Sequence, residues 1–214
     1  MDSSRTRLDL ALLPGMTDSG SPLDFLSHII RSRRSVKPFD LDPSRKVERD
    51  LLLQLLENAN WAPTHGLTEP WRFRVFQDDA RKELSAAMQD IYRATTPAQE
   101  FREDKLKKMS ENPLLAPVVI ALGMVRRGGA KIPEIEEVEA TACAAQNLLL
   151  SAHAAGLAGY WSSPPLIGTR EFAEFLGLGQ EDRCLGLLYL GWPREGLKMA
   201  KGVRGLVETK ISWA

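Results

Sequence analysis

The stretch RSRRSVKPF, at residues 31–39, is the most informative part of the sequence. It places four cations and two hydroxyls within seven residues, directly before a proline that cannot continue a helix. Two interpretations are open. Cations in a last helical turn complement the helix dipole, and cations gathered beside hydroxyls bind a small anion. The candidates for such an anion site are the cations and hydroxyls of residues 31–37 as a group.

Apolar residues recur at helical spacing on both sides of this stretch. Residues 22–30 predict a helix that leads into it, and residues 47–60 predict a second, largely buried helix. The charged region 78–112 predicts two helices broken near residues 96–97, as a surface flap or a substrate lid. The best-signalled helix covers about 133–155, and its small residues predict packing on all sides, including against a second copy of the chain.

Short apolar or alternating runs predict the strands of a sheet. Two of these runs, 117–123 and 184–191, are continuously apolar, which is typical of strands buried on both faces. The complete set comprises strands at 72–76, 117–123, 158–161 and 184–191, a helix at 170–177 and an extended tail at 207–213. Residues 1–22 predict an extension, and 23–214 predict one domain.

Composition excludes several classes of protein. The 214 residues are 43% hydrophobic and 26% charged, which suits a globular chain with a full core. Lys plus Arg equals Asp plus Glu at 28 each, so no excess charge favours a nucleic-acid partner. We expect Cys143 and Cys184 to be buried free thiols. No run approaches a membrane span and no signal-peptide pattern opens the chain, so we expect a cytoplasmic protein with no membrane partner.

Familiar catalytic motifs are missing from the sequence. There is no GxGxxG after a strand, no Walker A pattern, no GxSxG, no HExxH and no CxxC pair. The polar loop 61–71, between a predicted helix and a predicted strand, is where a site is expected. His65 in this loop has no second ligand nearby in sequence, so we predict no metal site.

Six segments in order resemble the nitroreductase family of FMN enzymes. They are RRSVKPF at 33–39, APTH at 62–65 with TEPWRF at 68–73, KIPE at 131–134, AAQNLLL at 144–150, Trp161, and LGWP at 190–193. The resemblance implies an α+β fold with a central mixed sheet flanked by helices. It further implies an intertwined homodimer, with flavin sites built from both chains.

The resemblance also implies a role for particular residues. Arg33 and Ser35 match positions that hold the FMN phosphate and ribityl chain, and Arg34 contributes main chain or charge there. Lys37 matches the cation beside the pyrimidine edge of the ring. The flavin contacts that the resemblance implies also include His65 and Glu69 on a loop from the partner subunit, the turn of Tyr160, Trp161 and Ser162, and the tail residue Arg204.

The implied reaction is a ping-pong transfer of hydride from NADH or NADPH, through FMN, to a nitroaromatic, a quinone or a similar small acceptor. No catalytic side chain is predicted, because cofactor and solvent can carry the proton chemistry. Two alternatives stay open: another reaction of the same fold, such as dehalogenation or dehydrogenation, or a flavin-binding sensor or interaction protein without turnover.

Overall fold

The computed structural model describes residues 21–127 and 131–214. The described chain forms two compact units, one of residues 34–201 and one of residues 21–33 with 202–214. Most of the predicted extension at 1–22 lies outside the described residues. The domain boundary at 23 stays a prediction.

The smaller unit contains helix α1 (Pro22–Ser32), as predicted, and the C-terminal tail. α1 begins at a capping box in which the Ser21 hydroxyl accepts from the Asp24 N–H and the Asp24 carboxylate accepts from the Ser21 N–H. The tail forms the short 3₁₀ turn η6 (Val207–Lys210), where an extended pattern was predicted. The Thr209 hydroxyl donates to the Leu206 carbonyl at 2.8 Å and stabilises this turn.

The larger unit is built on a four-stranded sheet in the order β1-β2-β4-β3, and all its strand pairs are antiparallel. The sheet's mixed character is limited to one parallel bridge, between Ser35 and Gly159 at the β3 edge. The four predicted strands are confirmed with small shifts of boundary, as β1 (Trp71–Gln77), β2 (Val118–Met124), β3 (Ala158–Ser162) and β4 (Arg183–Gly191).

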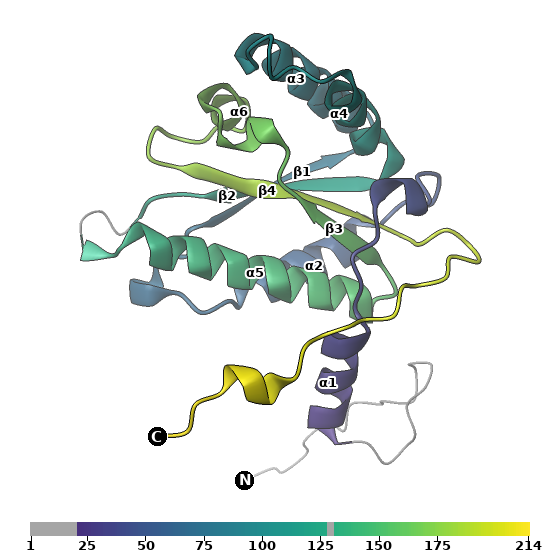
Figure 1. Cartoon of the computed structure of the whole chain (residues 1–214), viewed down its shortest axis with the longest axis vertical. Helices are drawn as coiled ribbons and strands as arrows, with labels where there is room; N and C mark the ends of the chain where they lie inside the picture. Colours follow the sequence, from purple (N-terminus) through teal and green to yellow (C-terminus); the bar gives the residue numbers. More distant parts are fainter. Residues whose placement is uncertain (1–20, 128–130) are drawn as a thin grey trace. The chain divides into compact units, whose positions relative to one another are not determined.

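Helices cover both faces of this sheet, as expected for an α+β fold (Figure 1). One face packs against α3, α4 and α6, and the other packs against α2 and α5. The helices are α2 (Arg49–Asn60), α3 (Ala80–Thr95), α4 (Glu103–Leu115), α5 (Glu134–Ala154) and α6 (Arg170–Phe175), with the short 3₁₀ turns η2 (Pro38–Asp40), η3 (His65–Leu67) and η5 (Pro165–Gly168).

Alternation along the central strand β2 divides the core in two. Val119 and Ala121 point to the α3/α4/α6 layer, whereas Val118 and Ile120 point to the α2/α5 layer. Every residue of β2 is buried, because helices lie on both faces of the strand. The continuous apolar run at 117–123 predicts a strand buried on both faces, and the structure confirms it.

The predicted packing of α5 on all sides is wrong for a single chain. Ala144 and Ala145 are fully buried on the inner side of the helix, but Cys143 is exposed. Of the two thiols expected to be buried, only Cys184 is so. Small residues permit close packing on any side of a helix, and they do not indicate which sides the same chain covers.

Within the described residues, no helix combines the length and the apolarity that a membrane crossing needs.

Candidate functional site

The basic segment lies against the edge strand β3, more than a hundred residues away in sequence. The Val36 N–H donates to the Gly159 carbonyl at 3.1 Å, next to the bridge between Ser35 and Gly159. Val36 is buried, so its neighbours Ser35 and Lys37 are turned outward and are exposed. A hydroxyl and an ammonium therefore stand beside β3 on a backbone that is fixed by hydrogen bonds.

Two cations of this segment have defined neighbours within the larger unit. Arg34 Nε donates to the Ala200 carbonyl at 2.9 Å. Lys37 Nζ lies 5.8 Å from the centroid of the Phe39 ring, in the range of a cation–π interaction. Both positive charges therefore lie at the β3 edge, and that of Lys37 is exposed to solvent.

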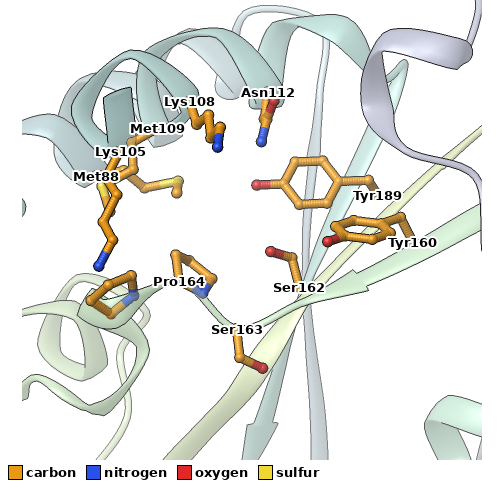
Figure 2. Close-up of a pocket in the computed structure, with 11 residues that line it drawn as sticks. Met88, Lys105, Lys108, Met109, Asn112, Tyr160, Ser162, Ser163, Pro164 and Tyr189 are labelled. Atoms are coloured by element: carbon orange, nitrogen blue, oxygen red, sulfur yellow. The ribbon is translucent and has the colours of Figure 1, made fainter. Parts of the chain in front are cut away.

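A cavity of about 400 Å³ opens at the end of β3, between this strand and α4 (Figure 2). Tyr160 and Ser162 contribute to it, because residues two apart on a strand share a face. The chain then turns through Ser163 and Pro164 along the side of the cavity. The volume falls in the range of small-molecule sites.

Helix α4 supplies the opposite wall. Lys105, Lys108 and Asn112 lie three and four residues apart, so they project from one face of the helix. Met109, on the same face, is buried and anchors it to the core. In Figure 2 the ends of Lys108 and Asn112 point into the cavity and face Ser162.

Tyr189, from β4, closes the floor of the cavity and points its hydroxyl into it (Figure 2). Burial raises the pKa of this phenol above its ordinary value, and the nearby Tyr160 adds to the effect. The two rings are 6.4 Å apart and tilted. Tyr189 therefore stays protonated at neutral pH and can donate a hydrogen bond.

Trp161 faces the other side of the sheet. Its ring packs with the α2/α5 core, and its indole N–H donates to the Leu185 carbonyl at 3.1 Å. The ring crosses β4 at Gly186, where a Cβ atom would lie 2.3 Å from the indole nitrogen. Of the predicted turn, only Tyr160 and Ser162 present side chains to the cavity.

The loop carrying His65 and Glu69 lies at the other edge of the sheet, before β1. His65 Nδ1 pairs with Glu136 at the start of α5. Thr64 Oγ1 accepts from the Glu69 N–H at 3.3 Å. Gly66, Leu67 and Glu69 all have positive φ, of 59°, 54° and 44°, so the loop contains strained backbone.

The larger unit thus brings together Arg34, Ser35 and Lys37 with Tyr160 and Ser162, all along β3. It does not bring His65 or Glu69 to them: three strand spacings, roughly 14 Å, separate β1 from β3. Arg33 and Arg204 belong to the smaller unit, in which Arg204 donates to the Val203 carbonyl at 2.8 Å.

Sequence reasoning missed the wall of α4 and the phenol of Tyr189. The region 78–112 was recognised as a flap or lid, but its charges fall on many sides of the helices. Residues three or four positions from an inward methionine share its face, but the burial of Met109 is known only from the structure.

Comparison with known proteins agrees with this architecture. The family model described as the nitroreductase family matches residues 30–192. The Bacillus subtilis protein YfhC, provisionally named an NAD(P)H nitroreductase, is 29% identical over 82% of this chain and 88% of its own length.

Solved structures share the fold. A nitroreductase-like family protein from Bacillus cereus superposes with a TM-score of 0.76 at 29% identity, over 93% of this chain and 98% of the other. A provisionally named nitroreductase from Desulfovibrio desulfuricans, solved in complex with FMN, gives 0.67 at 22% identity, over 92% and 99%.

Proposed function

The chain belongs to the nitroreductase family, and on that premise we propose that it is an NAD(P)H-dependent oxidoreductase that carries FMN and reduces a nitroaromatic, a quinone or a similar small acceptor. One observation supports the proposal more than any other. The segment 34–37 and the strand β3 come from distant parts of the sequence, yet they lie side by side next to a cavity.

The donor groups along β3 suit FMN. Arg34 and the Ser35 hydroxyl provide the charge and the hydrogen bond that a phosphate and a ribityl chain require, and Arg33 adjoins them in sequence. Lys37 provides a cation for the flavin ring. Asn112 and Lys108 provide donors toward the cavity, where the carbonyl oxygens of a flavin ring can accept them. Bound FMN supplies two-electron chemistry, taking hydride from NAD(P)H and giving it to the acceptor.

The chain's own residues have defined tasks in this scheme. The ammonium of Lys37 favours negative charge near it, and so favours the reduced state of a flavin ring at that position. The protonated Tyr189 and the Ser162 hydroxyl orient whatever occupies the cavity by hydrogen bonding. The apolar side chains of Met88, Met109 and Pro164 offer packing to an apolar ligand.

We propose further that two copies of the chain form the working unit. The loop 65–69 cannot reach β3 of its own chain, so any joint site for the two must use a second copy. A single chain leaves large apolar side chains uncovered on this layer, since Leu53 of α2 is 53% exposed and Trp61, directly after α2, is 79% exposed. Two-fold contacts made by this layer would bury these side chains.

The test of the reaction is an absorbance spectrum of the purified protein, followed by mass identification of any released cofactor and anaerobic addition of NADPH and then NADH. We expect a flavin spectrum, released FMN and bleaching by at least one nicotinamide. A protein that binds FMN but is reduced by neither would favour the flavin sensor. A colourless protein that takes up no added FMN would refute the proposal.

The test of the dimer is light scattering on the eluted protein, with Leu53→Glu as the disrupting variant. We expect twice the chain mass for the native protein and a monomer for the variant. A monomeric native protein with full FMN content would contradict the two-copy site.

A further inference from the structure

The cavity between α4 and β3 carries two lysines, and the proposed function uses only one of them, Lys108, as a donor toward the flavin ring. Lys105 and Lys108 both line it, and no aspartate or glutamate occurs among the lining residues that the structure describes. The remaining lining groups are neutral hydroxyls, an amide, two methionines and two prolines. A cavity of this composition favours a ligand that is both apolar and negatively charged.

The two ammonium groups differ in their partners. Lys108 lies 3.7 Å from Asp104, but that carboxylate already accepts two hydrogen bonds from Arg102, at 2.8 and 3.0 Å. Lys105 is half-buried, and no described carboxylate lies within ion-pair distance of its ammonium. The charge of Lys105 is thus the one that a ligand can most readily complement.

The position of Lys105 also suits a residue that discriminates between acceptors. Its side chain runs along the cavity toward the turn at Pro164, away from Asn112 and Tyr189 (Figure 2). It borders a neighbouring cavity as well, whose lining includes Glu100 and Arg102. Lys105 therefore stands at the rim, where one end of an elongated acceptor would emerge.

We propose that Lys105 is a specificity-determining residue, and that the acceptor of this enzyme is an aromatic molecule bearing a carboxylate or a similar acidic group. This inference rests on the proposed oxidoreductase function. The aromatic part packs against the methionines, the prolines and Tyr160, while the acidic group meets the Lys105 ammonium at the rim.

The test compares two acceptors of nearly the same shape, 4-nitrobenzoate and 4-nitrobenzamide, on the FMN-loaded protein. The quantity measured is the ratio of their kcat/KM values, so differences in intrinsic reactivity cancel between variants. We expect Lys105→Met to lower the benzoate-to-benzamide ratio about tenfold, the size of one charge-assisted contact. Lys105→Glu should lower it further, and added salt should lower the ratio of the native protein.

Lys107→Met is the matched control. Lys107 lies on the same helix, is exposed, pairs with Glu111 at 3.8 Å and does not line the cavity. Its ratio should equal that of the native protein. An unchanged ratio in Lys105→Met, or an equal fall in both variants, would overturn the inference.

Failure of the inference can be separated from failure of the proposed function. Bound FMN with normal turnover of 4-nitrobenzamide and no effect of Lys105 would refute only the role of Lys105. If neither acceptor is reduced, equilibrium dialysis of 4-nitrobenzoate still decides, since Lys105→Met should weaken its binding about tenfold. Equal binding to both proteins would refute the role of Lys105 without reference to turnover.

Discussion

The two edges of the sheet present candidate site residues in opposite ways. At the β3 edge, Ser35 and Lys37 stand on backbone that is hydrogen-bonded to a neighbouring strand. At the β1 edge, His65 and Glu69 stand on a loop whose backbone is strained and whose side chains are exposed. A side chain that must hold a fixed position suits a backbone that is fixed by hydrogen bonds. Strained loops are typical of side chains that act on a ligand or a partner.

The difference also indicates what each edge requires. The β3 edge is a completed structure within one chain, because Val36 is buried and its N–H is paired. The loop at the β1 edge has hydrogen bonds of its own, and Arg72 donates to its Glu69 carbonyl at 2.9 Å. It also touches α5 through His65 and Glu136, so part of its support depends on how firmly the start of α5 is tied to the sheet.

The largest effect is expected from breaking the ion pair between Arg126 and Glu137, which joins the start of α5 to the end of β2. Glu137 is 1% exposed, pairs with Arg126 just after β2, and also accepts from the Arg127 N–H at 3.0 Å. Arg126→Met leaves this carboxylate buried without its guanidinium, so the free energy of unfolding should fall by about 3–5 kcal/mol. Urea denaturation measures the change.

The control for this prediction is Arg183→Met, which breaks a pair with Glu134 on the exposed side of the same helix start. Water solvates both of those charges, so little change is expected. The double variant Arg126→Met with Glu137→Leu should recover most of the lost stability, because it removes both buried charges together. A mild effect of Arg126→Met alone would show that water reaches Glu137.

The second effect concerns the β3 edge. A Cβ atom at Gly159 would lie 2.7 Å from Leu149 Cδ2 and 2.9 Å from Leu190 Cδ2, so β3 has no room for a side chain there. Gly159→Val should lower the free energy of unfolding by about 1–3 kcal/mol through overpacking. It should also reduce FMN content, because the displaced strand no longer holds Val36.

Gly168→Ala serves as the matched control, since a Cβ atom there meets nothing within 4 Å. Thermal unfolding and the ratio of flavin absorbance to protein absorbance are measured on both variants. Loss of FMN without loss of stability in Gly159→Val would mean that the contact to Val36 matters more than the packing.

The sequence predicted the elements of this fold better than their assembly. The apolar run at 117–123, the proline before residue 39 and the acidic start of α5 each determine local structure, and all three are found as expected. The pairing of Ser35 with Gly159 joins residues 124 positions apart. No local pattern encodes that distance, and the resemblance to a known family supplied only the list of residues.

One feature of the site follows from pattern reasoning, and two others do not. Alternation along β3 requires Tyr160 and Ser162 to face one way and Trp161 the other, which is what the structure shows. The exposure of Cys143 was out of reach, because small residues surround α5 and only tertiary packing decides which of them are covered. The same holds for Lys108, whose helix is charged on several sides.

A smaller effect tests the strain of the β1-edge loop. Leu67 has a φ of 54° and is 83% exposed, so its side chain contributes little packing to offset the left-handed backbone. Leu67→Ala removes the side chain but keeps the Cβ penalty, whereas Leu67→Gly removes both. The glycine variant should be more stable than the alanine variant by about 1 kcal/mol.

If this loop completes a site on a second copy, both variants should lose turnover although one of them is more stable than the other. Thermal unfolding and kcat/KM with 4-nitrobenzamide separate the two quantities. Equal stability of the glycine and alanine variants would mean that the backbone at residue 67 is not strained in solution.

The smallest effect leaves stability unchanged and concerns the two thiols, which lie on opposite faces of the sheet. Burial raises the pKa of Cys184 to about 11, so at pH 8 almost none of it is thiolate and iodoacetamide should not modify it. Cys143 lies on the exposed outer surface of α5, and a second copy packed there would protect it. Peptide mass mapping should therefore find neither cysteine modified in the native dimer, and only Cys143 modified in Leu53→Glu. Rapid labelling of Cys143 in the native protein would place the partner elsewhere than on α5, and the loop at 65–69 would then have to meet β3 of the other copy by a different route.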